Sequence, residues 1–180
     1  MTVDYEPIVT GTAPDQIKAV AQDVQQQHEG LGLRVQNKAE FTLVAPLVPG
    51  GAAQLRERAT GKGQFEAPYW EGSLGTVHDL RIVIFNDDAS VLFAATYSDD
   101  FKPYVYDVIK RATPWLDYMF AGTAEGYPGL ASPDAVAWIL KYTVQASLWF
   151  ASHADLSVRD ITRSVKVSSA WDALIDASQQ

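Results

Sequence analysis

Two apolar runs separated by a short polar stretch form the clearest pattern in this chain of 180 residues. His78–Phe85 and Val91–Tyr97 are rich in β-branched and aromatic residues, which are typical of strands. Residues 86–90 between them, Asn-Asp-Asp-Ala-Ser, are types that form turns. The pattern therefore predicts an antiparallel hairpin.

Further elements of both kinds flank this hairpin. The spacing of apolar residues predicts helices over Ala13–His28 and Phe101–Arg111, and a run of good helix formers predicts a short helix over Ala52–Thr60. Strand-forming residues predict two more strands, over Phe41–Val48 and Trp115–Ala121. From the first strand to the last the order is β-α-β-β-α-β, which is the ferredoxin-like pattern. We therefore predict an α+β fold built on an antiparallel sheet.

The last part of the chain predicts two further helices. The first begins at Ser132 and ends near His153. The second begins at Ser157, where Asp160 lies at the spacing of a capping box. The apolar residues of this second helix should pack against the sheet or against a partner; they are Trp171, Leu174 and Ile175.

The length and composition fit one domain, residues 1–180. Hydrophobic residues make up 47% of the chain and charged residues 20%, which is ordinary globular usage. We divide the domain into an N-terminal helix and connection (1–40), a ferredoxin-like core (41–128) and a helical C-terminal extension (129–180). The sequence predicts no linker between folded units.

The charge balance argues against one class of partner. Asp and Glu number 22 against 14 Lys and Arg, which gives a formal charge of −8. Such a chain repels a polyanion unless its basic residues gather on one face, and the longest basic stretch, Arg56–Lys62, is interrupted by Glu57. We therefore expect no nucleic-acid partner.

Three features of the sequence bear on the possible chemistry and on the location of the protein in the cell. Cysteine is absent, which excludes thiolate nucleophiles, thiolate metal sites and disulfides. The first ten residues lack the basic and apolar regions of a secretion signal. The most apolar stretch, Ala135–Ala151, is short and contains Lys141 and Gln145. We expect a cytoplasmic protein without a membrane partner.

Four segments carry a family resemblance: Val77–Ile84, Val91–Tyr97, Glu125–Pro128 and Asp155–Asp160. Together they resemble a bacterial group within the dimeric α/β-barrel superfamily, more in the order of elements than in any single motif. The resemblance implies a homodimer whose sheets join and enclose a pocket for a small-molecule ligand. The superfamily includes antibiotic-type monooxygenases, haem-handling proteins and dye-decolourising peroxidases, so the fold alone assigns no reaction.

One short motif bears on the cofactor. Gly122-Thr-Ala-Glu-Gly126 is similar to the Gly-x-x-Asp-Gly haem-side motif of dye-decolourising peroxidases, with Glu125 in place of Asp. Those peroxidases are generally two fused ferredoxin-like halves, whereas this chain has room for one half plus helices. The cofactor therefore stays open, with haem as one candidate. The three His residues are scattered along the chain, so we expect no metal site.

The hairpin offers a polar cluster. A five-residue turn would place Arg81 opposite Ala95. In the same register Asp79 faces Tyr97, so Asp79, Arg81 and Tyr97 would share one face of the sheet. A buried Arg needs an acidic partner, which could be Asp79, Glu125 or an anionic ligand. The cluster is then either an internal ion pair or a substrate-binding site.

Three other residues are candidates for chemistry or binding. His78 and Glu125 could move protons, and His78 could also ligate haem iron. Tyr127, like Tyr97, could line an apolar pocket and orient a ligand with its hydroxyl. His78 could instead end the strand at the surface, and Tyr97 and Tyr127 could belong to the core or to the dimer interface.

Two functions remain open on this reading. The first is a homodimeric small-molecule-binding protein that acts as an oxidoreductase or isomerase in an apolar pocket. In it Arg81 orients an anionic group, and His78 or Glu125 moves protons. The alternative is a noncatalytic binding or assembly module, in which the C-terminal helices form a partner surface.

Overall fold

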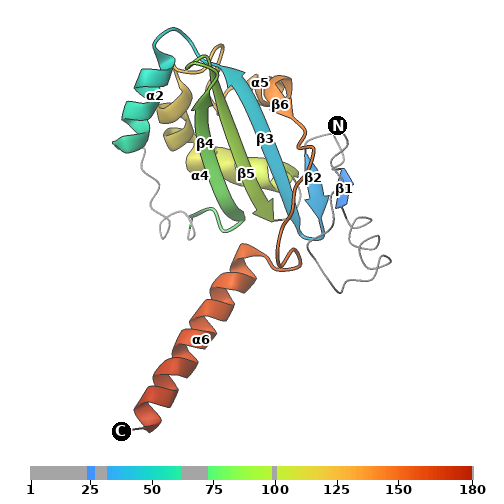
Figure 1. The fold of residues 1–180 in the computed structure, drawn as a ribbon, viewed down its shortest axis with the longest axis vertical. Coiled ribbons are helices and arrows are strands. Elements are labelled where there is room, and N and C mark those ends of the chain that lie inside the picture. Colours follow the sequence, from blue (N-terminus) through green and yellow to red (C-terminus); the bar gives the residue numbers. More distant parts are fainter. Residues whose placement is uncertain (1–23, 27–31, 62–72, 99–100, 180) are drawn as a thin grey trace, which may run out of the picture.

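A computed structural model describes residues 24–26, 32–61, 73–98 and 101–179. The fold is a mixed α+β arrangement around one antiparallel sheet, ordered β1-β2-β3-β5-β4, with β6 paired to β3 (Figure 1). The strands are β1 Val24–Gln26, β2 Leu33–Val35, β3 Lys38–Pro46, β4 Val77–Phe85, β5 Ser90–Ser98 and β6 Thr143–Val144. The helices are α2 Gly51–Thr60, α4 Phe101–Phe120, α5 Ala135–Tyr142 and α6 Val158–Ser178.

The predicted hairpin is confirmed, but its register is one residue from the predicted one. Phe85 pairs with Ser90, so the turn holds four residues, three of which have positive φ values. Asn and Asp tolerate this left-handed conformation better than most residues, which explains the Asn-Asp-Asp sequence of residues 86–88. Arg81 therefore pairs with Ala94, and Asp79 pairs with Thr96.

The predicted first helix corresponds to no helix in the described residues. Most of Ala13–His28 lies outside them. Within it, Val24–Gln26 forms β1 and pairs antiparallel with β2. Backbone hydrogen bonds to a neighbouring strand here outweigh the helix propensity of the glutamines.

The predicted strand over Trp115–Ala121 is wrong, because residues 115–120 continue α4. Ala112, Leu116 and Met119 recur at four and three residues and are buried, which is a helical period. Pro114 lies inside the helix and removes a backbone N–H donor, but burial of this face stabilises the helix across it. The order over residues 38–120 is thus β-α-β-β-α, and the sheet does not close into a barrel.

The helix predicted from Ser132 to His153 is much shorter. It covers only α5, and the chain becomes extended at Thr143. Thr143 and Val144 form β6 and pair with Leu43 and Thr42 of β3. Both residues are β-branched, which favours this extended conformation.

The core lies on one face of the sheet, against α2, α4 and α5. Phe93 of β5 is at its centre, with its ring centroid 5.9 Å from that of Phe41 and 6.0 Å from that of Phe120. Leu55 of α2 and Met119 of α4 are fully buried in the same cluster. Figure 1 shows α4 and α5 behind the sheet and the opposite face of β4 and β5 without a covering helix.

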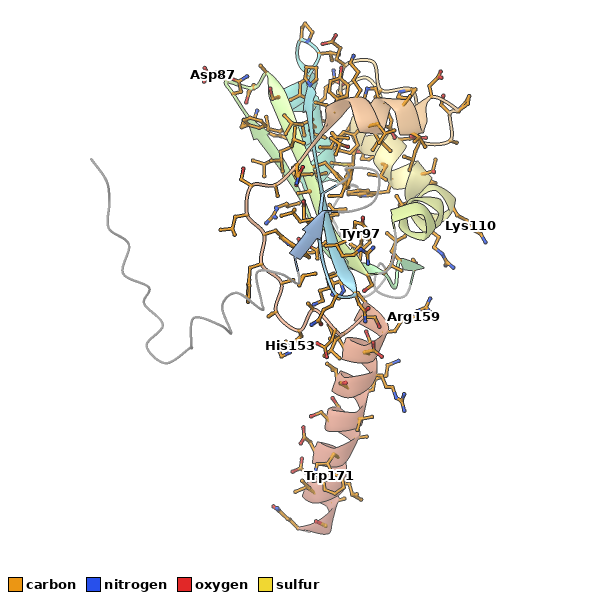
Figure 2. The ribbon with its side chains drawn as sticks, turned by 90° about the vertical axis from the view of Figure 1, so that its right-hand side faces the viewer. Asp87, Tyr97, Lys110, His153, Arg159 and Trp171 are labelled. Atoms are coloured by element: carbon orange, nitrogen blue, oxygen red, sulfur yellow. The ribbon has the colours of Figure 1, made fainter. Side chains whose placement is uncertain are left out.

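The predicted capping box of α6 is confirmed, but the helix does not pack on the sheet. The Ser157 side chain accepts from the backbone N–H of Asp160, and the Asp160 carboxylate accepts from the backbone N–H of Ser157. From this cap α6 runs away from the sheet, and Trp171 lies far from the body (Figures 1 and 2). In the described part of the chain, none of the helices has the length and apolarity needed to cross a bilayer.

Candidate functional site

His78 lies in an irregular step of β4, where the pairing with β5 shifts between Val77 and Asp79. Its Nε2 atom is 2.8 Å from the Oγ atom of Ser98, which is only 1% exposed. Burial is the largest cause that lowers the pKa of His78 from 6.5 to about 4, and nearby Lys38 lowers it further. The imidazole is therefore neutral near pH 7 and can accept or donate one hydrogen bond at Nε2.

Other buried polar groups lie on the same face of the sheet. The Nζ atom of Lys38 donates to the carbonyl oxygen of Ser152, at 3.0 Å. The Glu40 carboxylate accepts from the backbone N–H of Leu33 at 2.9 Å and from the Thr42 hydroxyl at 3.1 Å. These bonds satisfy charges that would otherwise be costly to bury.

A serine hydrogen-bonded to a neutral histidine resembles the start of a nucleophile–base pair. In the described residues no carboxylate is hydrogen-bonded to His78, and the Ser98 hydroxyl is shielded from solvent. A substrate cannot reach a buried hydroxyl without rearrangement of the strand. The arrangement therefore supports a structural hydrogen bond that orients the end of the hairpin.

We expect His78 to make the protein sensitive to mild acid. Between pH 6.5 and 4 the unfolded chain binds a proton that the folded chain excludes, so stability is full above pH 6.5 and falls as the pH decreases. Because His78 is only half-buried, we expect a loss of about 1 kcal/mol in the free energy of unfolding between pH 7 and pH 5. Urea unfolding of the wild type and of His78→Gln at both pH values measures it.

Exposed His153 provides the matched control for this experiment. His153→Gln should keep the pH dependence of the wild type, whereas His78→Gln should reduce it. If His78→Gln and the wild type show equal pH dependence, a group other than His78 takes up the proton on unfolding.

The structure does not bring Asp79, Arg81 and Tyr97 together. Asp79 and Arg81 are exposed on the open face of β4. Tyr97 pairs with Val77, points to the core and is fully buried. The one-residue difference in register places Tyr97 on the opposite face, because side chains alternate along a strand. The predicted shared face is therefore wrong.

Tyr127 and Glu125 lie in the turns between α4 and α5. The Tyr127 hydroxyl donates to Oδ1 of Asp117 at 2.7 Å, and burial together with this bond raises the pKa of Tyr127 far above its ordinary value. Glu125 is exposed, its backbone N–H donates to the carbonyl oxygen of Pro46, and its own carbonyl accepts from Nε1 of Trp138. Tyr127 is thus a fixed neutral phenol, and Glu125 a turn residue with its side chain in solvent.

A small apolar cavity lies between the sheet and the helices. Its volume is about 60 Å³. The lining residues are Phe41, Leu43, Phe93, Val108, Leu116, Phe120, Tyr127, Leu130, Trp138 and Ile139. Of the residues singled out from the sequence, only Tyr127 lines this cavity. His78 and Glu125, the two candidates for proton transfer, do not line it.

Haem does not fit this cavity. Pockets for drug-sized ligands measure about 300–1,000 Å³, and haem is larger than most such ligands. The segment similar to the haem-side motif forms turns, with positive φ at Gly122 and Gly126. Across the described ranges, no group of three or more metal-binding side chains is arranged around a common point.

Sequence reasoning missed one surface feature, the basic side of α6. Arg159, Arg163 and Lys166 recur at four and three residues, and this spacing alone could have revealed a basic side of the helix. Trp171, Leu174 and Ile175, expected to pack against the sheet or a partner, are exposed in the single chain. Comparisons with protein-family models, with curated proteins and with solved structures found no match to this chain.

Proposed function

We propose that the protein is a noncatalytic assembly module that forms a homodimer by pairing α6 with α6 of a second copy. The observation that carries this proposal is the set of large apolar side chains exposed along α6. We call this set the α6 stripe: Ile161, Val165, Val167, Trp171, Leu174 and Ile175.

The α6 stripe has the geometry of a helix-pairing surface. At 3.6 residues per turn its members fall on one half of the circumference of the helix. Trp171 is 61% exposed and Leu174 60%, which is unusual for side chains whose burial contributes about 1.5–3 kcal/mol each. A contiguous exposed apolar surface of this kind typically marks an interaction site.

The charge distribution favours an antiparallel pair. Three basic and three acidic residues make α6 neutral, so the whole formal charge of −8 lies outside it. In a parallel pair, the negatively charged remainders of the two chains would lie side by side at the same end of the paired helices. Antiparallel helices separate them by about 30 Å, the length of α6, which exceeds the screening distance of about 8 Å at physiological salt. Antiparallel pairing also sets the basic first half of α6 beside the acidic second half of its partner.

The absence of cysteine makes the pairing directly measurable. Light scattering should give a mass twice that of the 19.7 kDa chain. Ser168 lies midway between Ile161 and Ile175, so Ser168→Cys should form an intermolecular disulfide in an antiparallel pair. Ser178→Cys should not, because disulfides need Cα atoms within about 7 Å. A monomeric mass at all concentrations, or efficient crosslinking through residue 178, would contradict the proposal.

The second candidate is the sheet-joined homodimer with a small-molecule pocket that the superfamily resemblance implies, with oxidative or isomerising chemistry. One observation favours it: the open face of β4 exposes Val83 and Phe85 beside Asp79 and Arg81. Val83→Gln with Phe85→Gln decides between the two surfaces. This variant should stay dimeric if α6 pairs the chains, and become monomeric if the sheets do.

A further inference from the structure

We propose that the groove between the first half of α6 and the body binds a small anionic ligand that carries two or more phosphate groups. The groove has a volume of about 610 Å³. It is lined by Ser73, Gly75, Arg111, Val158, Arg159, Thr162, Arg163, Lys166, Val167 and Ala170. Figure 2 shows Arg159 at the root of α6.

Positive charge is concentrated in this groove. Four of its lining residues are basic, and none is acidic: Arg111 comes from α4, and Arg159, Arg163 and Lys166 come from α6. Asp160 lowers the positive field in part, since it interacts electrostatically with Arg163. In the part of the chain that the structure describes, neither Arg159 nor Lys166 is within salt-bridge distance of a carboxylate. A concentration of this kind in a chain of charge −8 attracts anions.

The donor types and their spacing define the ligand. Guanidinium groups match phosphate oxygens through paired N–H donors, and the hydroxyls of Ser73 and Thr162 add neutral donors. The basic residues of α6 are spread over about 10 Å of helix, from Arg159 to Lys166, so a ligand with several phosphate groups contacts more of them than a single phosphate does. A ligand with several phosphate groups spans this distance.

The groove and the α6 stripe share Val167 and otherwise use different residues. The basic residues Arg159, Arg163 and Lys166 lie on the half of the helix opposite to the stripe. Binding in the groove therefore does not depend on α6 pairing, and the two proposals fail independently.

Inorganic triphosphate is the probe for this site, measured by calorimetry on the full chain in a buffer without phosphate or sulfate. We expect saturable binding that weakens as salt is added, and at least tenfold weaker binding of inorganic monophosphate. Arg159→Gln with Arg163→Gln should weaken triphosphate binding at least tenfold, because both substitutions remove charge-assisted hydrogen bonds to the phosphate groups. Glutamine keeps the helix propensity of these exposed positions.

The matched control removes two positive charges elsewhere. Arg56→Gln with Lys141→Gln changes α2 and α5, neither of which lines the groove, and should bind triphosphate as the wild type does. Light scattering of both variants should give the mass of the wild type. Undetectable triphosphate binding, equal binding of monophosphate, or an equal loss in the two variants would each overturn the proposal.

Discussion

In the proposed α6-paired dimer, Trp171→Gln with Leu174→Gln should give a monomer at micromolar concentration. Each side chain occurs twice in a two-fold pair, and burial of one such side chain contributes about 1.5–3 kcal/mol. The dissociation constant should therefore rise at least a hundredfold, since about 1.4 kcal/mol corresponds to a factor of ten. Sedimentation equilibrium over a range of concentrations measures the change.

The control for this variant removes exposed apolar side chains from another place. Leu148 and Phe150 precede α6 and are 88% and 81% exposed. Leu148→Gln with Phe150→Gln should leave the dimer intact, because neither residue belongs to the α6 stripe. If both double variants weaken association equally, the association is unspecific and the pairing of α6 is disproved. Circular dichroism should show the same helix content in all three proteins.

Phe93→Ala should cost about 3–5 kcal/mol of the free energy of unfolding, the range typical of buried Phe-to-Ala changes. Phe93 is 7% exposed, its ring contacts the rings of Phe41 and Phe120, and it already borders the apolar cavity. The substitution enlarges this cavity, and the surrounding strands cannot collapse fully into it. Urea unfolding at pH 7 measures the loss.

Phe85→Ala is the matched control, because Phe85 lies on the other face of the same hairpin. It is 41% exposed and lies on the face of β4 that points away from the core. Phe85→Ala should cost less than about 1 kcal/mol. A similar cost for both substitutions would mean that the two faces of the hairpin are equally buried, contrary to the described packing.

The sequence predicted elements with a strong local signal. The β4–β5 hairpin, α2 and the capped start of α6 each have a local cause: two apolar runs around a polar turn, good helix formers ending at Gly61, and the Ser157–Asp160 pair. The antiparallel α+β class follows from them. Elements whose identity depends on distant contacts were predicted less well.

Residues 115–120 show why. Trp115, Tyr118 and Phe120 suit a strand by propensity, but here they continue a helix whose buried face packs under the sheet. Thr143 and Val144 show the converse, since pairing with β3 ends α5. In both places tertiary packing decides between competing local preferences.

The predicted grouping of Asp79, Arg81 and Tyr97 on one face failed for a more specific reason. The Asn-Asp-Asp turn holds four residues rather than five, and this single residue moved Tyr97 to the core while Arg81 stayed in solvent. His78 is placed by the irregular step in β4, which the sequence did not reveal. The hydrogen bond between His78 and Ser98 depends on that step.

The direction of α6 is set at the corner between β2 and β3. Asn37 donates from its backbone N–H to the carbonyl oxygen of Ala154 and from Nδ2 to that of Asp155, and Lys38 donates to that of Ser152. These bonds tie the segment before α6 to two adjacent residues at the base of the helix. A rotation of about 10° at this base would move the tip of a helix of this length by about 5 Å. Substitutions at Asn37 or Lys38 would therefore change the direction of α6 and the position of the apolar side chains near its C-terminal end.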